Sequence, residues 1–249
     1  MKTKHLPLVK CLFLAAPLVQ LSSFTPPPFE TPIASEDLVI EERDGLLAME
    51  AEHFHKQELD SVRKWRLTTA SNVPVVDPDG DPQHAAGASG GAYLEGLPDT
   101  RRSHDDTLVE GQNFFPRPGT AGVLYYRIHI NTPGRYYVWA RIYSTNTEDN
   151  GLHVGIDGEW PETGQRLQWT AKDHWAWGSK QRTEEVHTGE RYKIFLDIAQ
   201  PGPHTIMFSM REDGTEFDKW LMTTDREFVQ PEDAGPAPIV RAGVLPDPF

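Results

Sequence analysis

The chain has 249 residues, enough for one large domain or two small ones, and its 37 acidic and 24 basic residues give a formal charge of −13. This charge excludes nucleic acid and anionic membrane surfaces as partners, because the protein would repel phosphate. With 20 glycines, 21 prolines and 10% aromatic residues, the composition favours a turn-rich all-β protein over a helical bundle.

The N-terminus has the pattern of an export signal. Lys2 and Lys4 precede an apolar run from Leu12 to Leu21, which is short for a membrane span and contains Pro17. We therefore expect a signal peptide over residues 1–24, no membrane span, and a secreted protein that is extracellular or periplasmic. A buried N-terminal helix is the alternative interpretation.

Proline content divides the rest of the chain. Residues 25–44 are proline-rich and then acidic, which is typical of a linker. Residues 229–249 are again rich in proline, and we expect them to form an extended tail. Residues 45–228 between these segments are expected to form one domain, without internal repeats.

Within this domain, apolar residues alternate with a period of two, as in half-buried β-strands. Residues 123–131 and 135–143 are the clearest case, and the Pro133-Gly134 turn between them predicts a hairpin. Many short strands separated by turns are typical of an all-β sandwich or jelly roll with long loops. Further strands are expected at residues 46–53, 92–95, 152–157, 192–198, 204–211 and 217–223.

Two features of the predicted strands and loops are candidates for a binding surface. The stretches 56–90 and 96–120 are long for loops of a compact domain, which is typical of functional or disordered segments. The outward face of the 135–143 strand also carries a stripe of large side chains. Either the long inserts cover this stripe, or it is a concave binding face. The stripe consists of Tyr137, Trp139, Arg141 and Tyr143.

Three aspartates in the first long stretch are spaced like the start of a calcium-binding loop. They are Asp77, Asp79 and Asp81. An EF-hand needs a glutamate at its twelfth position, and Ala88 occupies that position here. The pattern therefore fails, and we expect a solvated acidic turn.

Five short segments in order carry a family resemblance. The chain resembles the galactose-binding-like β-sandwich modules of carbohydrate-binding module families 6 and 35, which are appended to polysaccharide-degrading enzymes. The resemblance covers about residues 46–224, and this sequence departs from the families by its two long inserts and by the lack of an attached catalytic domain. The segments are Ala-Met-Glu-Ala-Glu at 48–52, Pro-Gly-Arg-Tyr-Tyr-Val at 133–138, Pro-Gly-Pro-His-Thr-Ile at 201–206, Arg-Glu-Asp-Gly at 211–214 and Phe-Asp-Lys-Trp at 217–220.

The resemblance implies a structural calcium ion that joins the first strand to the last. The positions that match its ligands are Glu50, Glu52 and Asp218. Residues i and i+2 project to the same side of a strand, and carboxylate oxygens suit calcium. The alternative is that the two glutamates lie on a solvated strand face.

The resemblance also implies an oligosaccharide or polysaccharide partner that is bound mainly by loops at one end of the sandwich. Sugars present C–H patches that pack on aromatic faces and hydroxyl groups that need paired donors and acceptors. Trp-Ala-Trp at 175–177 can place two rings on one side of an extended segment. The alternative is that the tryptophans are packing residues. The candidate sugar-binding residues are Arg141, Tyr143, Asn150, Trp169, Trp175 and Trp177.

No motif in the sequence identifies a catalytic site. The chain has no Gly-x-Ser-x-Gly segment and no phosphate-binding loop, and no pair of acidic residues stands out as a glycosidase pair. We therefore expect a non-catalytic module that acts beside secreted polysaccharide-degrading enzymes. A polysaccharide lyase or glycoside hydrolase, and a protein-binding adhesion module, are the alternatives.

Overall fold

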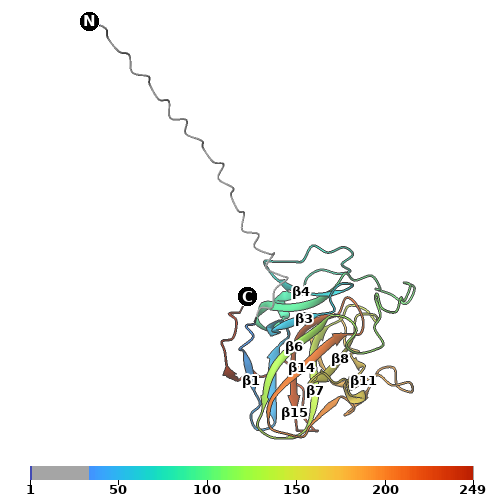
Figure 1. Cartoon of the computed structure of the whole chain (residues 1–249). Helices are drawn as coiled ribbons and strands as arrows, with labels where there is room; N and C mark the ends of the chain where they lie inside the picture. Colours follow the sequence, from blue (N-terminus) through green and yellow to red (C-terminus); the bar gives the residue numbers. More distant parts are fainter. Residues whose placement is uncertain (2–33, 249) are drawn as a thin grey trace.

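The computed structural model describes Met1 and residues 34–248, and these residues form two β-sheets that pack face to face (Figure 1). The predicted class, an all-β sandwich with long loops, is confirmed. The predicted signal peptide and the first part of the predicted linker lie outside the described residues. Within the described residues, no helix has the length and apolar character needed to cross a membrane.

The first sheet has nine strands. Its order is β12 (Glu190–Arg191), β11 (Lys180–Gln181), β9 (Leu167–Gln168), β8 (Gly151–Ile156), β14 (Gly202–Met210), β6 (Val123–Ile130), β1 (Val39–Glu41) and β16 (Val240–Ala242), with β3 (Lys56–Glu58) also paired to β6. β1 lies in the segment expected to be a linker and β16 in the segment expected to be a tail, and these two strands pair with each other.

The second sheet has seven strands. Its order is β10 (Ala176–Gly178), β7 (Gly134–Tyr143), β15 (Glu216–Thr223), β5 (Ala92–Leu97) and β4 (Lys64–Thr69), with β13 (Phe195–Ile198) paired to β7 and β2 (Leu46–Glu50) paired to β15. Four single 3-10 turns complete the described elements: η1 (Ala51–His53), η2 (Ala85–Gly87), η3 (Ser89–Gly91) and η4 (Glu162–Gly164).

β6 and β7 are both strands, as the alternation predicts, but the predicted hairpin between them is wrong. β6 pairs with β14 in the first sheet, and β7 pairs with β15 in the second. The turn at Pro133-Gly134 therefore carries the chain from one sheet to the other. The reason is that both strands have an apolar face, and burying the two faces against each other across the sandwich makes the core.

The core between the sheets is rich in aromatic rings. Tyr126 packs on Trp220 with ring centroids 5.2 Å apart, and Phe208 packs on Phe217 at 5.0 Å. The Tyr126 hydroxyl donates a hydrogen bond to the Ala51 carbonyl oxygen at 2.6 Å, so its polar end is satisfied. Rings of this size bury large apolar areas and fix the relative position of the two sheets.

One histidine belongs to this interior. His153 of β8 is fully buried, with Nε2 3.0 Å from the Phe115 carbonyl oxygen and Nδ1 3.1 Å from the Arg166 backbone N–H. A neutral ring with its proton on Nε2 satisfies both contacts. Burial lowers the pKa of His153 to about 3, so this ring is uncharged at neutral pH.

Candidate functional site

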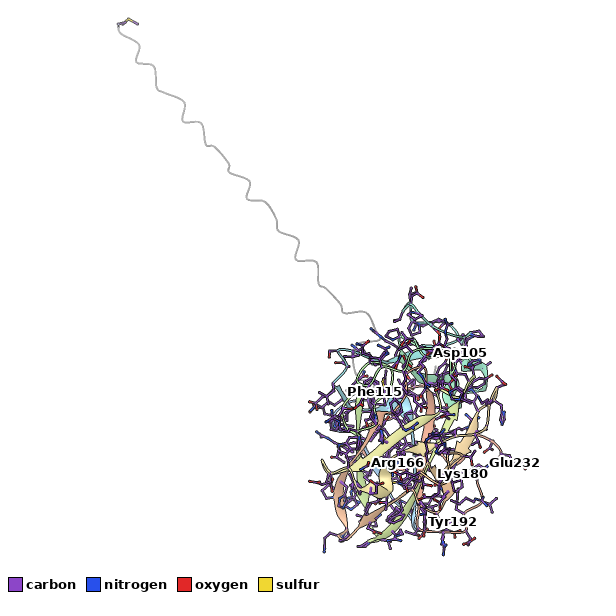
Figure 2. All side chains as sticks on the ribbon, turned by 90° about the vertical axis from the view of Figure 1, so that its right-hand side faces the viewer. Asp105, Phe115, Arg166, Lys180, Tyr192 and Glu232 are labelled. Atoms are coloured by element: carbon purple, nitrogen blue, oxygen red, sulfur yellow. The ribbon has the colours of Figure 1, made fainter. Side chains whose placement is uncertain are left out.

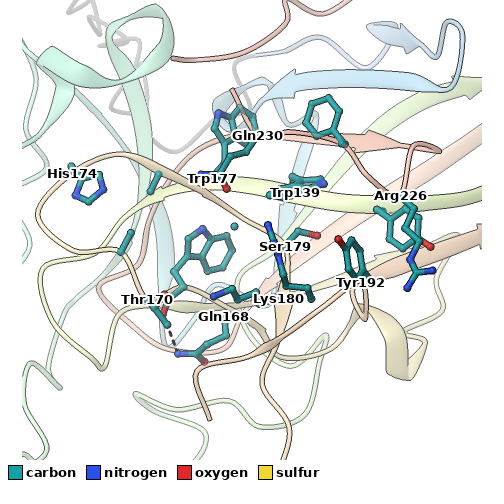
Figure 3. A pocket seen from close by; sticks show the side chains of 17 residues that line it. Trp139, Gln168, Thr170, His174, Trp177, Ser179, Lys180, Tyr192, Arg226 and Gln230 are labelled. Atoms are coloured by element: carbon teal, nitrogen blue, oxygen red, sulfur yellow. Dashed lines mark hydrogen bonds between the residues drawn. The ribbon is translucent and has the colours of Figure 1, made fainter. Parts of the chain in front are cut away.

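A cavity of about 270 Å³ opens on the outer face of the second sheet, over β7 and β10 (Figure 3). Its floor comes from the alternation along β7, since the core-facing Tyr136 and Val138 leave Tyr137 and Trp139 pointing outward. The lining residues are Tyr137, Trp139, Gln168, Trp169, Thr170, Ala171, His174, Ala176, Trp177, Gly178, Ser179, Lys180, Arg191, Tyr192, Arg226, Phe228 and Gln230.

The segment after β15 forms one wall of this cavity. Phe228 packs edge-on against Trp139 at 5.9 Å, and the Trp177 indole N–H donates to the Asp233 carbonyl oxygen at 3.0 Å. Arg226 lies 4.6 Å from the centre of the Tyr192 ring. Figure 3 shows Tyr192 and Arg226 close together at one end of the cavity and His174 at the other. The cavity is therefore assembled from four separate parts of the chain.

Three tryptophans line the cavity, and their indole N–H groups differ. Trp169 donates to the Ala140 carbonyl oxygen at 3.1 Å, and Trp177 donates to the segment after β15 as described above. The Trp139 N–H has no hydrogen-bond partner among the described residues, although the residue is only 9% exposed. A buried donor without a partner costs about 1–3 kcal/mol, which a ligand acceptor would recover.

The charge of the cavity is opposite to that of the protein. Lys180, Arg191 and Arg226 line it, and none of them has an ion-pair partner among the described residues. None of the described lining residues is an aspartate or glutamate, although the chain carries a formal charge of −13. Figure 2 shows Lys180 and Tyr192 well away from Asp105 of the 96–120 stretch.

The six predicted sugar-binding residues do not form one site. Trp169 and Trp177 line the cavity. Tyr143 and Trp175 lie at the loop end of the same sheet face, with ring centroids 5.5 Å apart. Arg141 lies with these two rings, its guanidinium 5.5 Å from the centre of the Trp175 ring, and forms an ion pair with Asp218.

Asn150 is buried next to the cavity wall, where its backbone carbonyl oxygen accepts a hydrogen bond from the Trp169 backbone N–H at 3.0 Å. Its backbone N–H donates to Glu212 at 3.0 Å, and its side-chain oxygen accepts a hydrogen bond from Gln168.

Five cavity residues have no local signal in the sequence, because distant segments bring them together. They are Gln168, Lys180, Tyr192, Arg226 and Gln230.

The outward stripe of β7 is covered at one end and open at the other. The long first insert covers the loop end, where His84 stacks on Tyr143 at 3.7 Å and Arg141 donates to the Gly87 carbonyl oxygen at 3.2 Å. At the other end Tyr137 and Trp139 form the cavity. The interpretation that an insert covers the stripe therefore holds for its loop end, and the binding role of the other end stays a prediction.

The three predicted calcium ligands lie near one another, but they are not among the described groups whose ligand atoms all lie within 4.8 Å of one another. Glu50 ends β2, Glu52 lies in η1 and Asp218 lies in β15, which is the antiparallel neighbour of β2. Glu52 is 1% exposed, so the alternative of a solvated strand face is wrong for this residue. One carboxylate oxygen of Glu50 and one of Glu52 are buried without a hydrogen-bond partner among the described residues.

Two cationic side chains of the chain itself also reach these carboxylates. Lys219 lies 2.8 Å from Glu50, and Arg141 pairs with Asp218. Burial, together with the negative charge of Glu50, raises the pKa of Glu52 well above its usual range. The calcium ion remains a prediction, and the two unpartnered oxygens and the all-carboxylate donor set fit it.

The fold and the cavity define an all-β sandwich domain with a ligand-sized hollow on one sheet face. The chain belongs to the family described as the glycosyl hydrolase family 115 C-terminal domain, whose model matches residues 85–238. Every residue that lines the cavity lies within the matched region.

A curated relative, "Uncharacterized protein P23" of Formosa agariphila, is 49% identical over 219 residues. The match covers 88% of this chain and 53% of that protein, so the chain spans about half the length of its relative.

Among solved structures, the chain is similar to the GH26-CBM35 β-(1,4)-mannanase of Podospora anserina, with 15% identity, a TM-score of 0.42, and coverage of 76% of this chain and 29% of that chain. A family 35 carbohydrate-binding module from Clostridium thermocellum gives 11% identity, a TM-score of 0.40, and coverage of 71% and 96%. The C-terminal CBM6 of the laminarinase LamC from Zobellia galactanivorans gives 14% identity, a TM-score of 0.35, and coverage of 72% of this chain and 99% of that chain. Assignment to family 6 or 35 itself stays a prediction.

Proposed function

We propose that this domain is a non-catalytic carbohydrate-binding module whose sugar site is the cavity over β7 and β10. The observation that carries the proposal is the combination of aromatic walls with the unpartnered indole N–H of Trp139. Aromatic faces pack on the C–H patches of a sugar ring, and a free buried donor recognises a hydroxyl or carboxylate oxygen. The family name, which refers to a domain of glycoside hydrolases, supports a role beside such enzymes.

The composition of the cavity supports binding without catalysis. A glycosidase works with two carboxyl groups on either side of the scissile bond. The described cavity residues include none. They offer tryptophan and tyrosine rings, amides, hydroxyls and cations, which suits recognition of a sugar but not its hydrolysis.

The cavity cations favour an acidic sugar as the ligand. Lys180, Arg191 and Arg226 have no carboxylate partner among the described residues, so a carboxylate or sulfate group on the ligand would supply it. The cavity volume of about 270 Å³ lies just below the usual range for small-molecule sites, which starts at about 300 Å³, so the cavity would hold only a short segment of a sugar chain.

The proposal is tested by a glycan array followed by calorimetry with neutral and acidic oligosaccharides. The same samples are assayed for new reducing ends and unsaturated ends. The proposal expects binding without product, and binding that is lost in Tyr192→Ala at the cavity. Tyr125→Ala is the matched control, because Tyr125 is also half-buried and also donates to a glutamate, but lies on the first sheet. Product release, or equal binding by both variants, contradicts the proposal.

A structural calcium ion at Glu50, Glu52 and Asp218 is the second part of the proposal. It would join β2 and η1 to β15 and provide a partner for the unpartnered oxygens of the two glutamates. The basic and apolar N-terminus further supports secretion, which would place the module in a calcium-containing environment with its polysaccharide.

A further inference from the structure

The aspartate-containing segment of the first long insert is not the solvated turn that its sequence predicts. Asp77 is exposed, but Asp79 and Asp81 are half-buried against the outer face of the second sheet. There they meet Glu95 of β5, and one ligand oxygen of each of the three lies within 4.8 Å of the others. The prediction of a solvated turn was wrong because the insert folds back onto the sheet, which the local sequence does not reveal.

Glu95 faces this group from inside the protein. It is 2% exposed, and no hydrogen bond or ion pair joins its carboxylate to another described residue. The charged groups that act most strongly on it are carboxylates, those of Glu216, Asp79, Asp81 and Asp99, and burial together with these charges raises the pKa of Glu95 to about 10. Arg66, which has an interaction of its own, lies opposite Glu95 in β4.

Asp79 adds a second unpartnered group. Its Oδ1 atom is buried and has no hydrogen-bond partner among the described residues. Burying a charged oxygen without a partner costs several kcal/mol, so such groups occur where a proton or a cation compensates the charge. The Asp79 Oδ1 atom and the Glu95 carboxylate lie close to one point, so a single cation placed there would partner both.

A neighbouring group shows what a satisfied arrangement looks like. Asp81, His84 and Glu216 also have ligand atoms within 4.8 Å of one another. His84 Nδ1, however, lies 2.9 Å from both Glu216 oxygens, and its ring stacks on Tyr143. His84 and Glu216 therefore already partner each other, while Asp79 and Glu95 have no such partner.

The donor set determines the kind of cation. Three carboxylates and no nitrogen or sulfur form a hard site, which suits Ca²⁺ or Mg²⁺. Ca²⁺ accepts six to eight oxygens in flexible geometry, whereas Mg²⁺ requires a near-ideal octahedron. Two donors come from a loop and one from a strand, so the irregular geometry favours Ca²⁺.

We propose that Asp79, Asp81 and Glu95 bind one Ca²⁺ ion, which holds the 77–84 segment against β5. This site is separate from Glu50, Glu52 and Asp218, and it does not depend on sugar binding. The ion would also order the loop-end aromatic group, because His84 follows the segment directly, stacks on Tyr143 and accepts a hydrogen bond from the Trp175 indole at 3.1 Å.

The experiment is calorimetric titration of the purified chain with Ca²⁺ alone, after treatment with a chelator. Glu95→Gln combined with Asp79→Asn keeps the shape of the site and removes two charges, and we expect it to lose one bound ion or to bind it more than ~100-fold more weakly. Asp77→Asn is the matched control from the same segment, and it should bind like the wild type. Glu52→Gln probes the other site.

The stoichiometries separate the two calcium proposals. If both are correct, the wild type binds two ions and each set of substitutions removes a different one. If only the present site exists, the wild type binds one ion, which is lost in the Asp79/Glu95 variant and kept in Glu52→Gln. Circular dichroism in chelator checks the fold of each variant, and we expect the Asp79/Glu95 variant to keep it, because amides carry no charge into the buried site. Equal Ca²⁺ binding by this variant and the wild type, or no Ca²⁺ binding by the wild type, overturns the inference.

Discussion

The unpartnered indole of Trp139 leads to a prediction in which stability and binding respond oppositely to two similar substitutions. Trp139→Phe and Trp169→Phe both shrink an aromatic ring at the same cavity. Trp169 loses a buried hydrogen bond to the Ala140 carbonyl oxygen, whereas Trp139 loses an N–H that has no partner. The two variants therefore share the cost of lost packing and differ in the hydrogen bond.

The magnitude follows from that difference. Losing part of a buried ring costs each variant about 1–2 kcal/mol. Trp169→Phe loses about 1 kcal/mol more with its hydrogen bond, while Trp139→Phe regains part of the cost of an unsatisfied donor, which is about 1–3 kcal/mol. We expect Trp169→Phe to be less stable than Trp139→Phe by about 2 kcal/mol. With an m-value of about 2 kcal/mol/M, this separates their urea midpoints by about 1 M.

Binding should show the reverse order. If the Trp139 N–H donates to a bound sugar, Trp139→Phe loses about 1 kcal/mol of affinity, which is about fivefold. The Trp169 N–H is already engaged with the protein, so Trp169→Phe should bind with nearly unchanged affinity in samples that are folded. Urea unfolding and calorimetry with a glycan found on the array provide the two readouts. Equal urea midpoints, or unchanged affinity in Trp139→Phe, would refute the reasoning.

Three further predictions concern acid, calcium and salt. Because the folded-state pKa of His153 lies below its unfolded value, the folded state binds fewer protons, and stability should fall as the pH drops from about 6.5 towards 3, by up to about 1.4 kcal/mol per pH unit. Urea unfolding measured across this pH range should show that the unfolding free energy of His153→Gln changes less with pH than that of the wild type. Chelator should lower the melting temperature of the wild type by more than that of Glu52→Gln, as measured by calorimetric scanning, and an equal loss would argue against calcium at Glu52. Lys180→Ala with Arg226→Ala should weaken binding of acidic oligosaccharides about tenfold or more and reduce the salt dependence of that binding, with neutral sugars unaffected. Affinities that change equally for both ligand classes would contradict the charge argument.

Eight of the sixteen described strands overlap segments that the sequence predicts to be strands, whereas β4 in the 56–90 stretch and seven strands of two or three residues do not. The alternation in β6 and β7 is strict, since Leu124, Tyr126, Ile128 and Ile130 are all buried on one face of β6. Side chains of a strand alternate between its two faces, so a half-buried strand leaves this pattern whatever its neighbours are. The same pattern does not reveal which strand is the neighbour, and the predicted hairpin was wrong for that reason.

The candidate sites were predictable only in part. Glu50, Glu52 and Asp218 were predicted as calcium ligands from the family resemblance, and the pairing of β2 with β15 brings Glu50 near Asp218, while the calcium ion itself stays a prediction. Asp79 and Asp81 were noticed, but their partner Glu95 lies on a strand whose sequence carries no sign of metal binding. Trp169 and Trp177 were identified, whereas the unpartnered donor of Trp139 became visible only when the hydrogen bonds of all three indoles were known.

The sequence by itself determined the β class, the strands with alternating faces and the acidic character of the protein, because each of these depends on neighbouring residues or on composition alone. Only the tertiary structure decided which sheet each strand joins, that β1 and β16 close the first sheet, and that the cavity on the second sheet carries cations without carboxylates. These features join residues far apart in the chain. Their free energy comes from burying apolar faces and pairing strand edges between distant segments, and no local pattern records which segments will meet.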